Sequence, residues 1–175
     1  MSQSEDITKD LFMELNDSDK FDNACIHVTE LLRNEYGDGS NNAFIRGKLY
    51  HYALESLLQK LEQKGKLKID ELEATHIVSY PLKDRTYRLC FTPDVIYQRN
   101  NKTILLEIKS TQKSLNYAFL QTSIYKYLLE KFFNKKIDEC GMLTGDLNYY
   151  KLLCDYDLGR QELEKRLNGS LLLFF

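Results

Sequence analysis

The sequence is poor in residues that build coil, and it has no long apolar run. Its 175 residues include only 2 Pro and 8 Gly, which excludes collagen-like chains and long coil stretches. No segment approaches the about 18 apolar residues of a transmembrane helix. The net charge is only −2, so binding to nucleic acid would depend on a local patch. The start, MSQSEDITKD, lacks a secretory-signal layout. We therefore expect a cytoplasmic protein, in a cell or a virus-infected host, with no membrane partner.

The chain has four cysteines, whose spacing is typical neither of a zinc ribbon nor of a disulfide framework. They form no C-x-x-C pair: Cys25, Cys90, Cys140 and Cys154. Such sparse cysteine is usual in a reducing compartment. We therefore expect four reduced thiols, most of them buried as small apolar side chains.

The chain does have enough apolar sequence for one folded domain. Apolar residues make up 43% and charged residues 29% of the 20.6-kDa chain, which is too apolar for a disordered protein. A domain of about 150 residues buries about 68–70% of the surface that its unfolded chain exposes. We expect a single domain over 1–175, with an N-terminal helical region at 1–42, a core at 43–155, and a C-terminal helix with an apolar tail at 156–175.

Helical periodicity dominates the first third of the chain. Apolar residues at helical spacing predict one helix around Leu11, Phe12 and Leu15, and a second across Cys25, Val28, Leu31, Leu32 and Tyr36. A polar loop at 37–42 precedes a long helix over 43–63. The apolar stripe of this long helix consists of Leu49, Tyr50, Ala53, Leu54, Leu57, Leu58 and Leu61.

Beyond residue 66 the pattern changes to the two-residue alternation of strands. The strand candidates are 67–80, 86–91, 94–98, 102–110, 141–144 and 149–155, and helices are expected at 115–133 and 158–167. This order of helices, strands, helix, strands and helix predicts an α/β domain in which helices flank a central sheet of mixed direction.

A tight hairpin is predicted where two strands meet at residues 100–101. The two asparagines at these positions suit the positive φ angles of a type I′ turn. A two-residue loop fixes the register, so that the numbers of paired residues add up to 201. In that register Asp94 lies directly opposite Glu107. Because side chains alternate along a strand, Lys109 then lies on the same face as Glu107.

Two carboxylates side by side in a buried hairpin need a counter-charge. Both faces of the predicted strands are apolar, which is typical of interior strands. Like charges opposite one another are destabilising, so Asp94 and Glu107 need a shared proton, a cation or both. Mg²⁺ meets this need, because it typically binds one or two carboxylates together with waters and phosphate oxygens. The alternative is an exposed edge hairpin in which Asp94 pairs with Lys109 or Arg99.

The same residues carry a resemblance to a nuclease family. Pro93-Asp94 followed by Glu107-Ile108-Lys109 resembles the signature of PD-(D/E)xK nucleases. Two further motifs are similar to those of the RecB-like branch: Gln121-Thr122-Ser123-Ile124-Tyr125 fits Q-x-x-x-Y, and Gly47-Lys48-Leu49-Tyr50-His51 fits G-x-x-x-H. The resemblance covers about residues 43–129. The stretch closely resembles the short RecB-like nucleases associated with CRISPR adaptation and their archaeal-virus relatives.

The resemblance implies a restriction-endonuclease-like core and a metal-dependent deoxyribonuclease. The implied ligands of its Mg²⁺ or Mn²⁺ are His51, Asp94, Glu107 and the backbone carbonyl of Ile108. A histidine ligand favours Mn²⁺. The resemblance also implies that Lys109 orients the attacking water or stabilises the developing negative charge. Gln121 and Tyr125, four residues apart on one helix face, would contact the DNA backbone or brace Lys109.

The cysteines depart from the pattern of those relatives. CRISPR-associated members usually carry one cysteine before the histidine motif and three clustered near the C-terminus, which hold an iron–sulfur cluster. Here Cys25 matches the first, but only Cys140 and Cys154 follow, 14 residues apart. We therefore expect no iron–sulfur cluster. Thr92 also stands where those relatives commonly have a glycine, which changes little by itself.

Several candidate residues also have an ordinary structural interpretation. His51 adjoins an apolar stripe, which is compatible with a half-buried structural histidine. Glu55, one turn away, is either an acceptor for the His51 imidazole N–H or a surface residue. The glutamine–tyrosine pair is compatible with plain helix surface. Glu73 resembles an acid of some relatives, and His27 is expected to be structural.

DNA is the implied partner, and two lysine clusters are candidates for contacts with its phosphates. They are Lys131, Lys135 and Lys136, and Lys60, Lys64, Lys66 and Lys68. Such runs are also ordinary solvated faces. The 12 Tyr and 9 Phe suit base stacking on single strands as well as an ordinary core. The apolar end at 170–175 either docks on the sheet or meets a second subunit, so a homo-oligomer is one expectation.

Together these features and the resemblance predict a metal-dependent deoxyribonuclease that hydrolyses phosphodiester bonds, and the resemblance implies single-stranded or end-containing DNA as its substrate. The alternative is a DNA-binding or assembly module that has lost catalysis on the same scaffold, and the intact acids and lysine weigh against it. A Holliday-junction or restriction-type endonuclease is a third interpretation. Those branches generally lack His51 and the pair formed by Gln121 and Tyr125.

Overall fold

A computed structural model describes residues 25–36 and 41–172, with side chains at 25–32 and 48–169. The helix expected around Leu11, Phe12 and Leu15 lies outside these residues, as do positions 37–40 of the expected loop and the side chains of the apolar tail. The described elements, in chain order, are β1 (Ile26–His27), α2 (Val28–Tyr36), α3 (Asn41–Gln63), β2 (Lys68–Leu72), β3 (His76–Leu82), β4 (Arg85–Phe91), β5 (Val95–Arg99), β6 (Lys102–Lys109), a 3₁₀ turn (Gln112–Ser114), α4 (Leu115–Phe133), β7 (Glu139–Thr144), β8 (Tyr149–Leu152) and α5 (Tyr156–Leu172).

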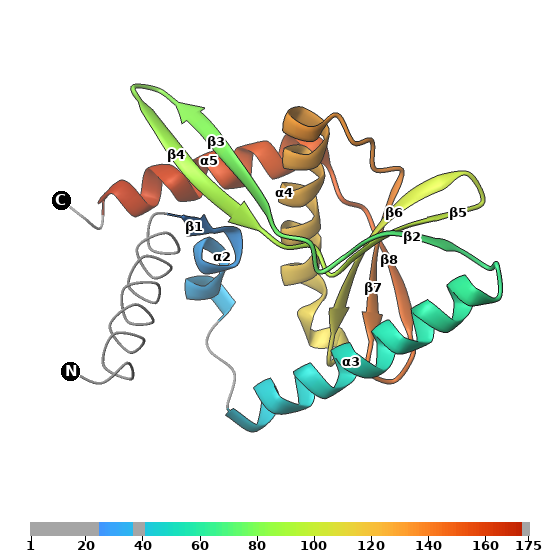
Figure 1. Cartoon of the computed structure of the whole chain (residues 1–175). Helices are drawn as coiled ribbons and strands as arrows, with labels where there is room; N and C mark the ends of the chain where they lie inside the picture. Colours follow the sequence, from blue (N-terminus) through green and yellow to red (C-terminus); the bar gives the residue numbers. More distant parts are fainter. Residues whose placement is uncertain (1–24, 37–40, 173–175) are drawn as a thin grey trace, which may run out of the picture.

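The strands form two sheets, with α4 standing between them (Figure 1). The larger sheet has the order β2-β5-β6-β7-β8 and is antiparallel except for the parallel pair β6–β7. The smaller one has the order β1-β4-β3, in which β1 runs parallel to β4. The predicted α/β class, with mixed sheets flanked by helices, is confirmed.

The strand expected at 67–80 is divided between the two sheets. β2 ends at Leu72 and joins the larger sheet, whereas β3 begins at His76 and joins the smaller one. Between them Glu73 has φ 48°. A non-glycine residue in this left-handed region cannot continue an extended strand, so the chain turns there and starts a second sheet.

The predicted hairpin register is confirmed. The ladder between β5 and β6 runs from Val95↔Leu106 to Arg99↔Lys102, and each pair of numbers adds up to 201. Asn100 and Asn101 have φ 54° and 61°, as the type I′ turn requires. The hairpin therefore delivers Asp94, the residue just before β5, to the position beside Glu107 in β6.

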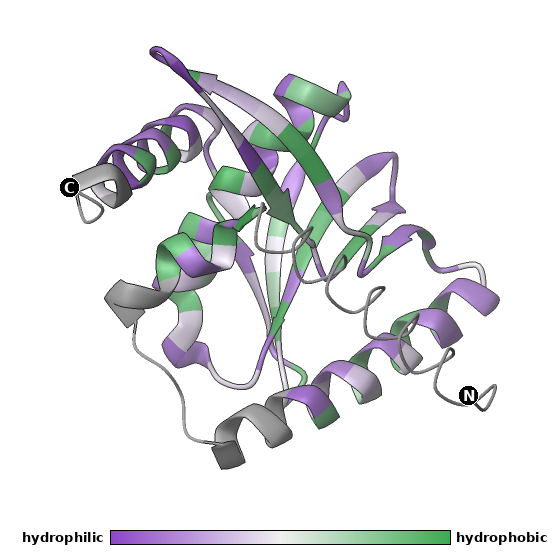
Figure 2. Cartoon of the chain, turned by 60° about the vertical axis from the view of Figure 1, so that its left-hand side comes forward, coloured by the Kyte–Doolittle hydropathy of each residue, from purple (hydrophilic) through white to green (hydrophobic). Residues whose placement is uncertain are grey.

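Both faces of the larger sheet are buried, as expected for interior strands. One face packs on α3 through an apolar cluster: Leu54, Leu58, Leu67, Val95, Tyr97, Ile104, Leu106 and Ile108. The other face packs on α4 and the smaller sheet, and its cluster includes Ile96, Leu105, Phe91, Ile124, Leu128 and Met142. Figure 2 shows hydrophobic strands at the centre and hydrophilic residues along the outer side of α5.

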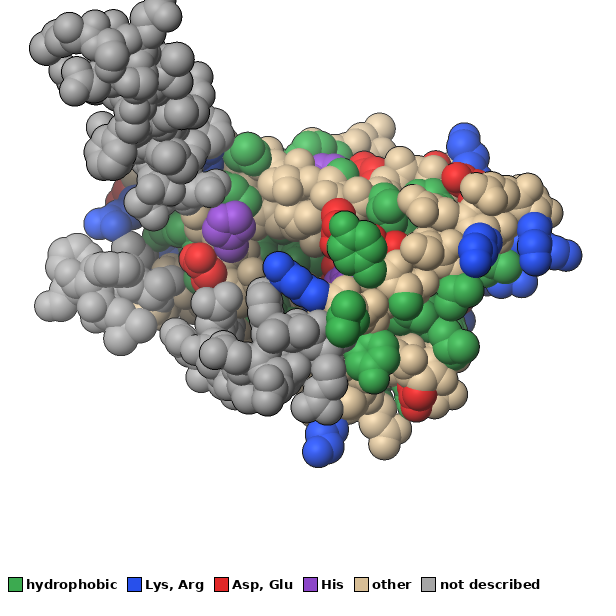
Figure 3. All heavy atoms as spheres, turned by 60° about the horizontal axis from the view of Figure 1, so that its bottom comes forward, with side chains coloured by type: hydrophobic (Ala, Val, Ile, Leu, Met, Phe, Trp, Pro, Cys, Tyr) green, Lys and Arg blue, Asp and Glu red, His purple; other side chains and the backbone are tan. Residues whose placement is uncertain are grey.

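The apolar stripe predicted for the long helix is only partly buried. In α3, Leu54 and Leu58 are 2% and 7% exposed, whereas Leu49, Leu57 and Leu61 remain exposed. Figure 3 shows hydrophobic side chains gathered on this side of the molecule. The reason is that α3 touches the larger sheet along one narrow line, so one residue per turn is enough to make the contact.

The expectation of four reduced thiols is wrong, because the cysteines form two disulfides. Cys25 is bonded to Cys90, with 5.9 Å between Cα atoms, and Cys140 to Cys154, with 6.0 Å. Cys25 lies just before β1 and not in a helix, and β1 pairs with the β4 strand that contains Cys90. Strand pairing thus brings together cysteines 65 positions apart, which spacing alone does not reveal. Cys25, Cys90 and Cys140 are buried, as expected.

The C-terminal helix crosses α4 at close range. A Cβ atom at Gly159 in α5 would overlap the backbone carbonyl of Ser123 in α4. The Ser123 hydroxyl also accepts a hydrogen bond of 3.1 Å from the N–H of Asp155, just before α5.

Within the part of the chain that the structure describes, no helix combines the length and apolar character needed to cross a membrane.

Candidate active site

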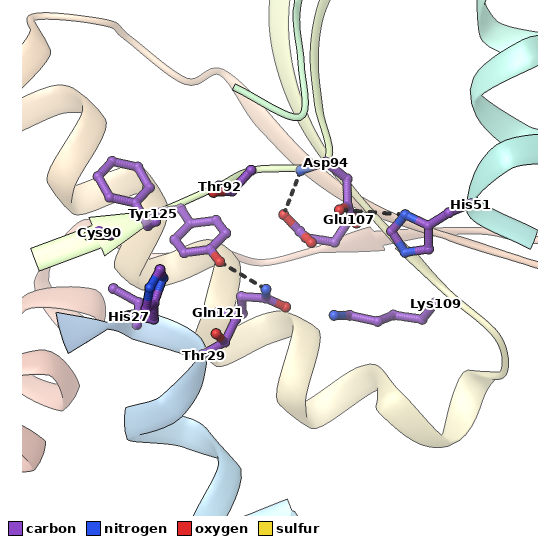
Figure 4. Close-up of a pocket in the computed structure, with 12 residues that line it drawn as sticks. His27, Thr29, His51, Cys90, Thr92, Asp94, Glu107, Lys109, Gln121 and Tyr125 are labelled. Atoms are coloured by element: carbon purple, nitrogen blue, oxygen red, sulfur yellow. Dashed lines mark hydrogen bonds and ion pairs between the residues drawn. The ribbon is translucent and has the colours of Figure 1, made fainter. Parts of the chain in front are cut away.

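A cavity of about 220 Å³ opens where the last residues of β4 and β6 meet α4. It contains every predicted site residue that acts through its side chain (Figure 4). The lining residues are His27, Val28, Thr29, His51, Cys90, Phe91, Thr92, Asp94, Glu107, Lys109, Gln121 and Tyr125. Three helices and two sheets therefore converge on one small space.

The two acids are held by backbone N–H groups, that of Asp94 itself and that of Ile108, the residue after Glu107. The N–H of Asp94 donates to Glu107 Oε1 at 3.2 Å, and the N–H of Ile108 donates to Asp94 Oδ2 at 2.7 Å. The N–H of Glu73 donates to the Asp94 carbonyl at 2.9 Å. These bonds fix both carboxylates although Asp94 lies outside the ladder.

Glu107 is the most deeply buried acid of the site, with 1% of its surface exposed. Burial raises its pKa well above the usual range, and the nearby charge of Asp94 raises it further, whereas Lys109 lowers it. The cavity thus holds a carboxyl group whose charged form lacks sufficient compensation. A bound cation would supply that compensation.

His51, on α3, bridges the two sides of the acidic half. Its Nε2 lies 2.9 Å from the carbonyl oxygen of Ile108, and its Nδ1 lies 3.7 Å from Asp94 Oδ1. Neighbouring ligands of an octahedral ion with bonds of 2.0–2.1 Å are about 3 Å apart. The spacing of His51 and Ile108 is therefore that of adjacent ligands, and without an ion it is that of an N–H···O hydrogen bond.

Two further acids extend this half of the site. His51, Glu55 and Glu73 each offer a ligand atom, and these atoms lie within 4.8 Å of one another. Burial and the negative charge of Glu73 raise the pKa of Glu55 to about 7. Within the described chain, Glu55 Oε1 is buried without a hydrogen-bond partner. The sequence indicated Glu55 only by its spacing from His51, and Glu73 only by resemblance.

These donors fit a divalent cation. Carboxylate and carbonyl oxygens suit Mg²⁺ and Mn²⁺, and one imidazole is compatible with Mn²⁺. The unpartnered oxygen of Glu55 and the raised pKa values of Glu55 and Glu107 are the features that a cation would relieve.

Lys109 is oriented by an aromatic ring that the sequence did not single out. Its Nζ lies 4.7 Å from the ring centre of Tyr117, within the range of a cation–π contact. Tyr117 precedes Gln121 by four residues on α4, so both lie on one helix face. The sequence signal for Tyr117 is its spacing, because Tyr117, Gln121 and Tyr125 follow one another at intervals of four residues.

Gln121 and Tyr125 form a buried pair at the back of the cavity. Gln121 Nε2 donates to the hydroxyl of Tyr125 at 3.0 Å. Both residues are buried, and burial together with the charge of Glu107 raises the pKa of Tyr125 well above its usual range. Tyr125 is therefore a neutral hydrogen-bonding group. In Figure 4 the amide of Gln121 lies between Tyr125 and the Lys109 ammonium.

The lysine clusters proposed for DNA contacts are partly neutralised. Lys135 pairs with Glu71 at 3.5 Å and with Asp70 at 4.0 Å, and Lys136 pairs with Asp138 at 3.5 Å. The cluster after α4 therefore contributes less positive charge to the surface than its sequence suggests.

Comparisons with known proteins support only the fold. No protein-family profile matches the chain, and no curated protein is similar to it in sequence. Among solved structures, the crystal structure of SSO0001 has a similar fold, with a TM-score of 0.55. The two sequences are 18% identical, and the match covers 86% of this chain and 76% of that chain.

Proposed function

We propose that this chain is a metal-dependent deoxyribonuclease of the PD-(D/E)xK superfamily, RecB-like branch, acting on single-stranded or end-containing DNA. One observation carries the proposal: Asp94, Glu107 and Lys109 share a cavity with a histidine and the Gln121–Tyr125 pair. A structural ion pair would not need this surplus of buried acid, since two carboxylates face one ammonium. A phosphodiesterase needs it to hold a cation against a phosphate.

The proposed ligands are His51, Asp94, Glu107 and the carbonyl of Ile108, with Glu73 close enough to contribute. The cation, Mg²⁺ or Mn²⁺, would polarise the scissile phosphate and lower the pKa of water bound to it. His51 would ligate through Nε2, which lies 2.9 Å from the Ile108 carbonyl oxygen, while its Nδ1, 3.9 Å from Glu73 Oε1 and 3.7 Å from Asp94 Oδ1, would face these acids as an N–H donor.

The other residues act on the reacting phosphate. Lys109, held over the Tyr117 ring, brings a positive charge to the oxygens on which negative charge develops. The Gln121 amide and the Tyr125 hydroxyl limit where the Lys109 ammonium can lie. The closed back of the cavity excludes bulk water, so that these charges act in a medium of lower dielectric constant.

We also propose that the protein works in the cytoplasm. Disulfides are rare in mesophile cytosol but frequent in intracellular proteins of hyperthermophiles. The location therefore predicts a thermophilic source for a chain with two disulfides. Alkylation of thiols during rapid lysis tests this. If the source is a mesophile and its cysteines fail to react because they are disulfide-bonded in the cell, the cytoplasm is excluded.

Incubation of the pure chain with labelled single-stranded DNA and Mn²⁺, with and without EDTA, tests the activity. We expect cleavage only with free metal, and Lys109→Ala and Glu107→Gln should abolish it while the fold is retained. Glu130→Gln, which changes an acid paired with Lys126 on α4 at 3.5 Å, is the control and should cleave normally. Linear and circular substrates then separate cutting at ends from internal cutting. DNA binding without cleavage would support the retired module instead.

A further inference from the structure

The cavity has two chemically different halves. The half described above carries the acids and His51. The other half is formed by β1, the start of α2 and the end of β4, and no acid is among the residues that line it: His27, Val28, Thr29, Cys90, Phe91 and Thr92. A DNA strand that places one phosphate at the acidic half can lay its next nucleotide across this acid-free half.

The start of α2 suits a phosphate. The helix has nine residues, and its first two, Val28 and Thr29, line the cavity. The N–H groups of a first helical turn have no partner within the helix, and the helix dipole adds partial positive charge there. His27, directly before the helix, adds an imidazole N–H donor. The acid of this turn, Glu30, is exposed and does not line the cavity.

An independent observation indicates that a ligand is expected in this space. Gln121 is only 3% exposed, and its Oε1 is buried without a hydrogen-bond partner among the described residues. Its other polar atom is already used, because Nε2 donates to Tyr125. Figure 4 shows this amide projecting into the cavity, with Thr29 and His27 on one side and Lys109 on the other. A buried acceptor without a donor is costly, and a base N–H would satisfy it.

The wall that carries His27 is fixed in place by a covalent bond. Cys25 is bonded to Cys90, and His27 pairs with Cys90 in the parallel ladder between β1 and β4. The donors are therefore held at a set distance from the acids before any ligand arrives. Such preorganisation reduces the entropy lost on binding.

We propose that the start of α2, with His27 and Thr29, is a subsite for the nucleotide next to the scissile bond. Its phosphate binds to the first N–H groups of α2 and to His27, and its base donates to Gln121 Oε1. This inference rests on the proposed function, since its ligand is the DNA strand that the acidic half would cleave. It adds a binding element of the N-terminal region that the sequence motifs do not include.

The test combines a substitution in the protein with a modification of the DNA and measures whether their effects on binding are coupled. Tetrathymidylates with one uncharged methylphosphonate at each linkage in turn are titrated into Lys109→Ala protein, which keeps every proposed metal ligand, with Mn²⁺, and binding is measured by fluorescence anisotropy. At one linkage the modification should weaken binding about tenfold, as expected for a lost hydrogen bond to a charged group. With His27→Gln added, that loss should fall to about twofold or less. His76 is a half-buried histidine of the same sheet that lies outside the cavity, so His76→Gln should leave the tenfold loss unchanged.

The outcomes separate this subsite from the nuclease activity. An equal penalty at every linkage with and without His27 overturns the subsite, as does the absence of any sensitive linkage. His27→Ala provides a second variant if His27→Gln does not fold. Binding is measured without cleavage, so the coupling is read even if the wild-type chain proves inactive. Cleavage by the wild-type chain without any coupling overturns the subsite alone.

Discussion

Replacing Glu107 by Gln should change the stability of the metal-free protein in a pH-dependent way. The side chain keeps its shape, and its amide oxygen can still accept from the Asp94 N–H, but the buried charge disappears. Burial and the charge of Asp94 raise the pKa of Glu107 in the folded chain. A raised pKa stabilises the fold below the unfolded-state pKa, and this contribution is lost as the pH rises through the folded-state value. Metal-free wild type should therefore lose stability relative to Glu107→Gln as the pH rises above the ordinary glutamate pKa of about 4.5.

Mn²⁺ should reverse this order. A ligand at 100 times its Kd stabilises the folded state by about 2.7 kcal/mol. For a chain of 175 residues, each kcal/mol shifts the Tm by about 2–4 °C. We therefore expect wild type to gain about 5–11 °C at pH 7.5. Glu107→Gln, which loses a charged ligand, should gain less than about 2 °C at the same Mn²⁺ concentration.

Scanning calorimetry with and without Mn²⁺ measures both effects. Glu130→Gln, on the same helix as Gln121 but outside the cavity, is the control and should retain the full shift with Mn²⁺. Equal shifts for wild type and Glu107→Gln would refute the assignment of Glu107 as a ligand. A pH-independent difference between the metal-free proteins would refute the argument about its buried charge.

Three further predictions concern helix packing, a cross-link and a buried hydrogen bond. Gly159→Ala should lower the free energy of unfolding by about 1–3 kcal/mol through overpacking against α4. Gly169→Ala, whose Cβ meets nothing within 4 Å, should raise it by about 0.5–1 kcal/mol; equal effects in urea unfolding would contradict the helix contact. The double change Cys25→Ser and Cys90→Ser opens a loop of 65 positions and should cost about 4 kcal/mol in urea unfolding; a reductant should destabilise wild type further, because it also breaks the Cys140–Cys154 bond, and an unchanged midpoint of the double variant would contradict the cross-link. Tyr125→Phe removes the acceptor of a buried amide and should cost about 1–3 kcal/mol; an unchanged midpoint in urea would show that another group accepts that bond.

The local parts of the fold could be predicted from the sequence. The register of β5 and β6 follows from two asparagines in a two-residue turn, because such a turn leaves only one pairing. The bounds of α4, Leu115–Phe133, also follow from periodicity alone. Since Asp94, Glu107 and Lys109 depend only on this hairpin, their shared position in one cavity could be predicted as well.

The parts that depend on distant pairing could not. The pairing of β1 with β4 joins segments more than 60 positions apart, and it determines both the Cys25–Cys90 bond and the place of His27. β1 has only two residues, which is too short for the alternation of a strand to show in the sequence. The exposure of Leu49 and Leu57 depends on how much of α3 the sheet covers, and hydrophobicity does not report that. The role of Tyr117 needed the folded position of Lys109, and the spacing of Glu55 from His51 left open whether it belongs to the site or to the surface.

The Cys25–Cys90 bond also changes what a break in the backbone does. It closes a covalent loop of the chain that contains α2, α3 and the strands from β1 to β4. A protease that cuts one peptide bond anywhere between these cysteines leaves the two fragments tethered, with His27 still beside the strand that leads to Asp94. Only a reductant would then separate the pieces, so the nicked molecule migrates as an intact chain on a non-reducing gel.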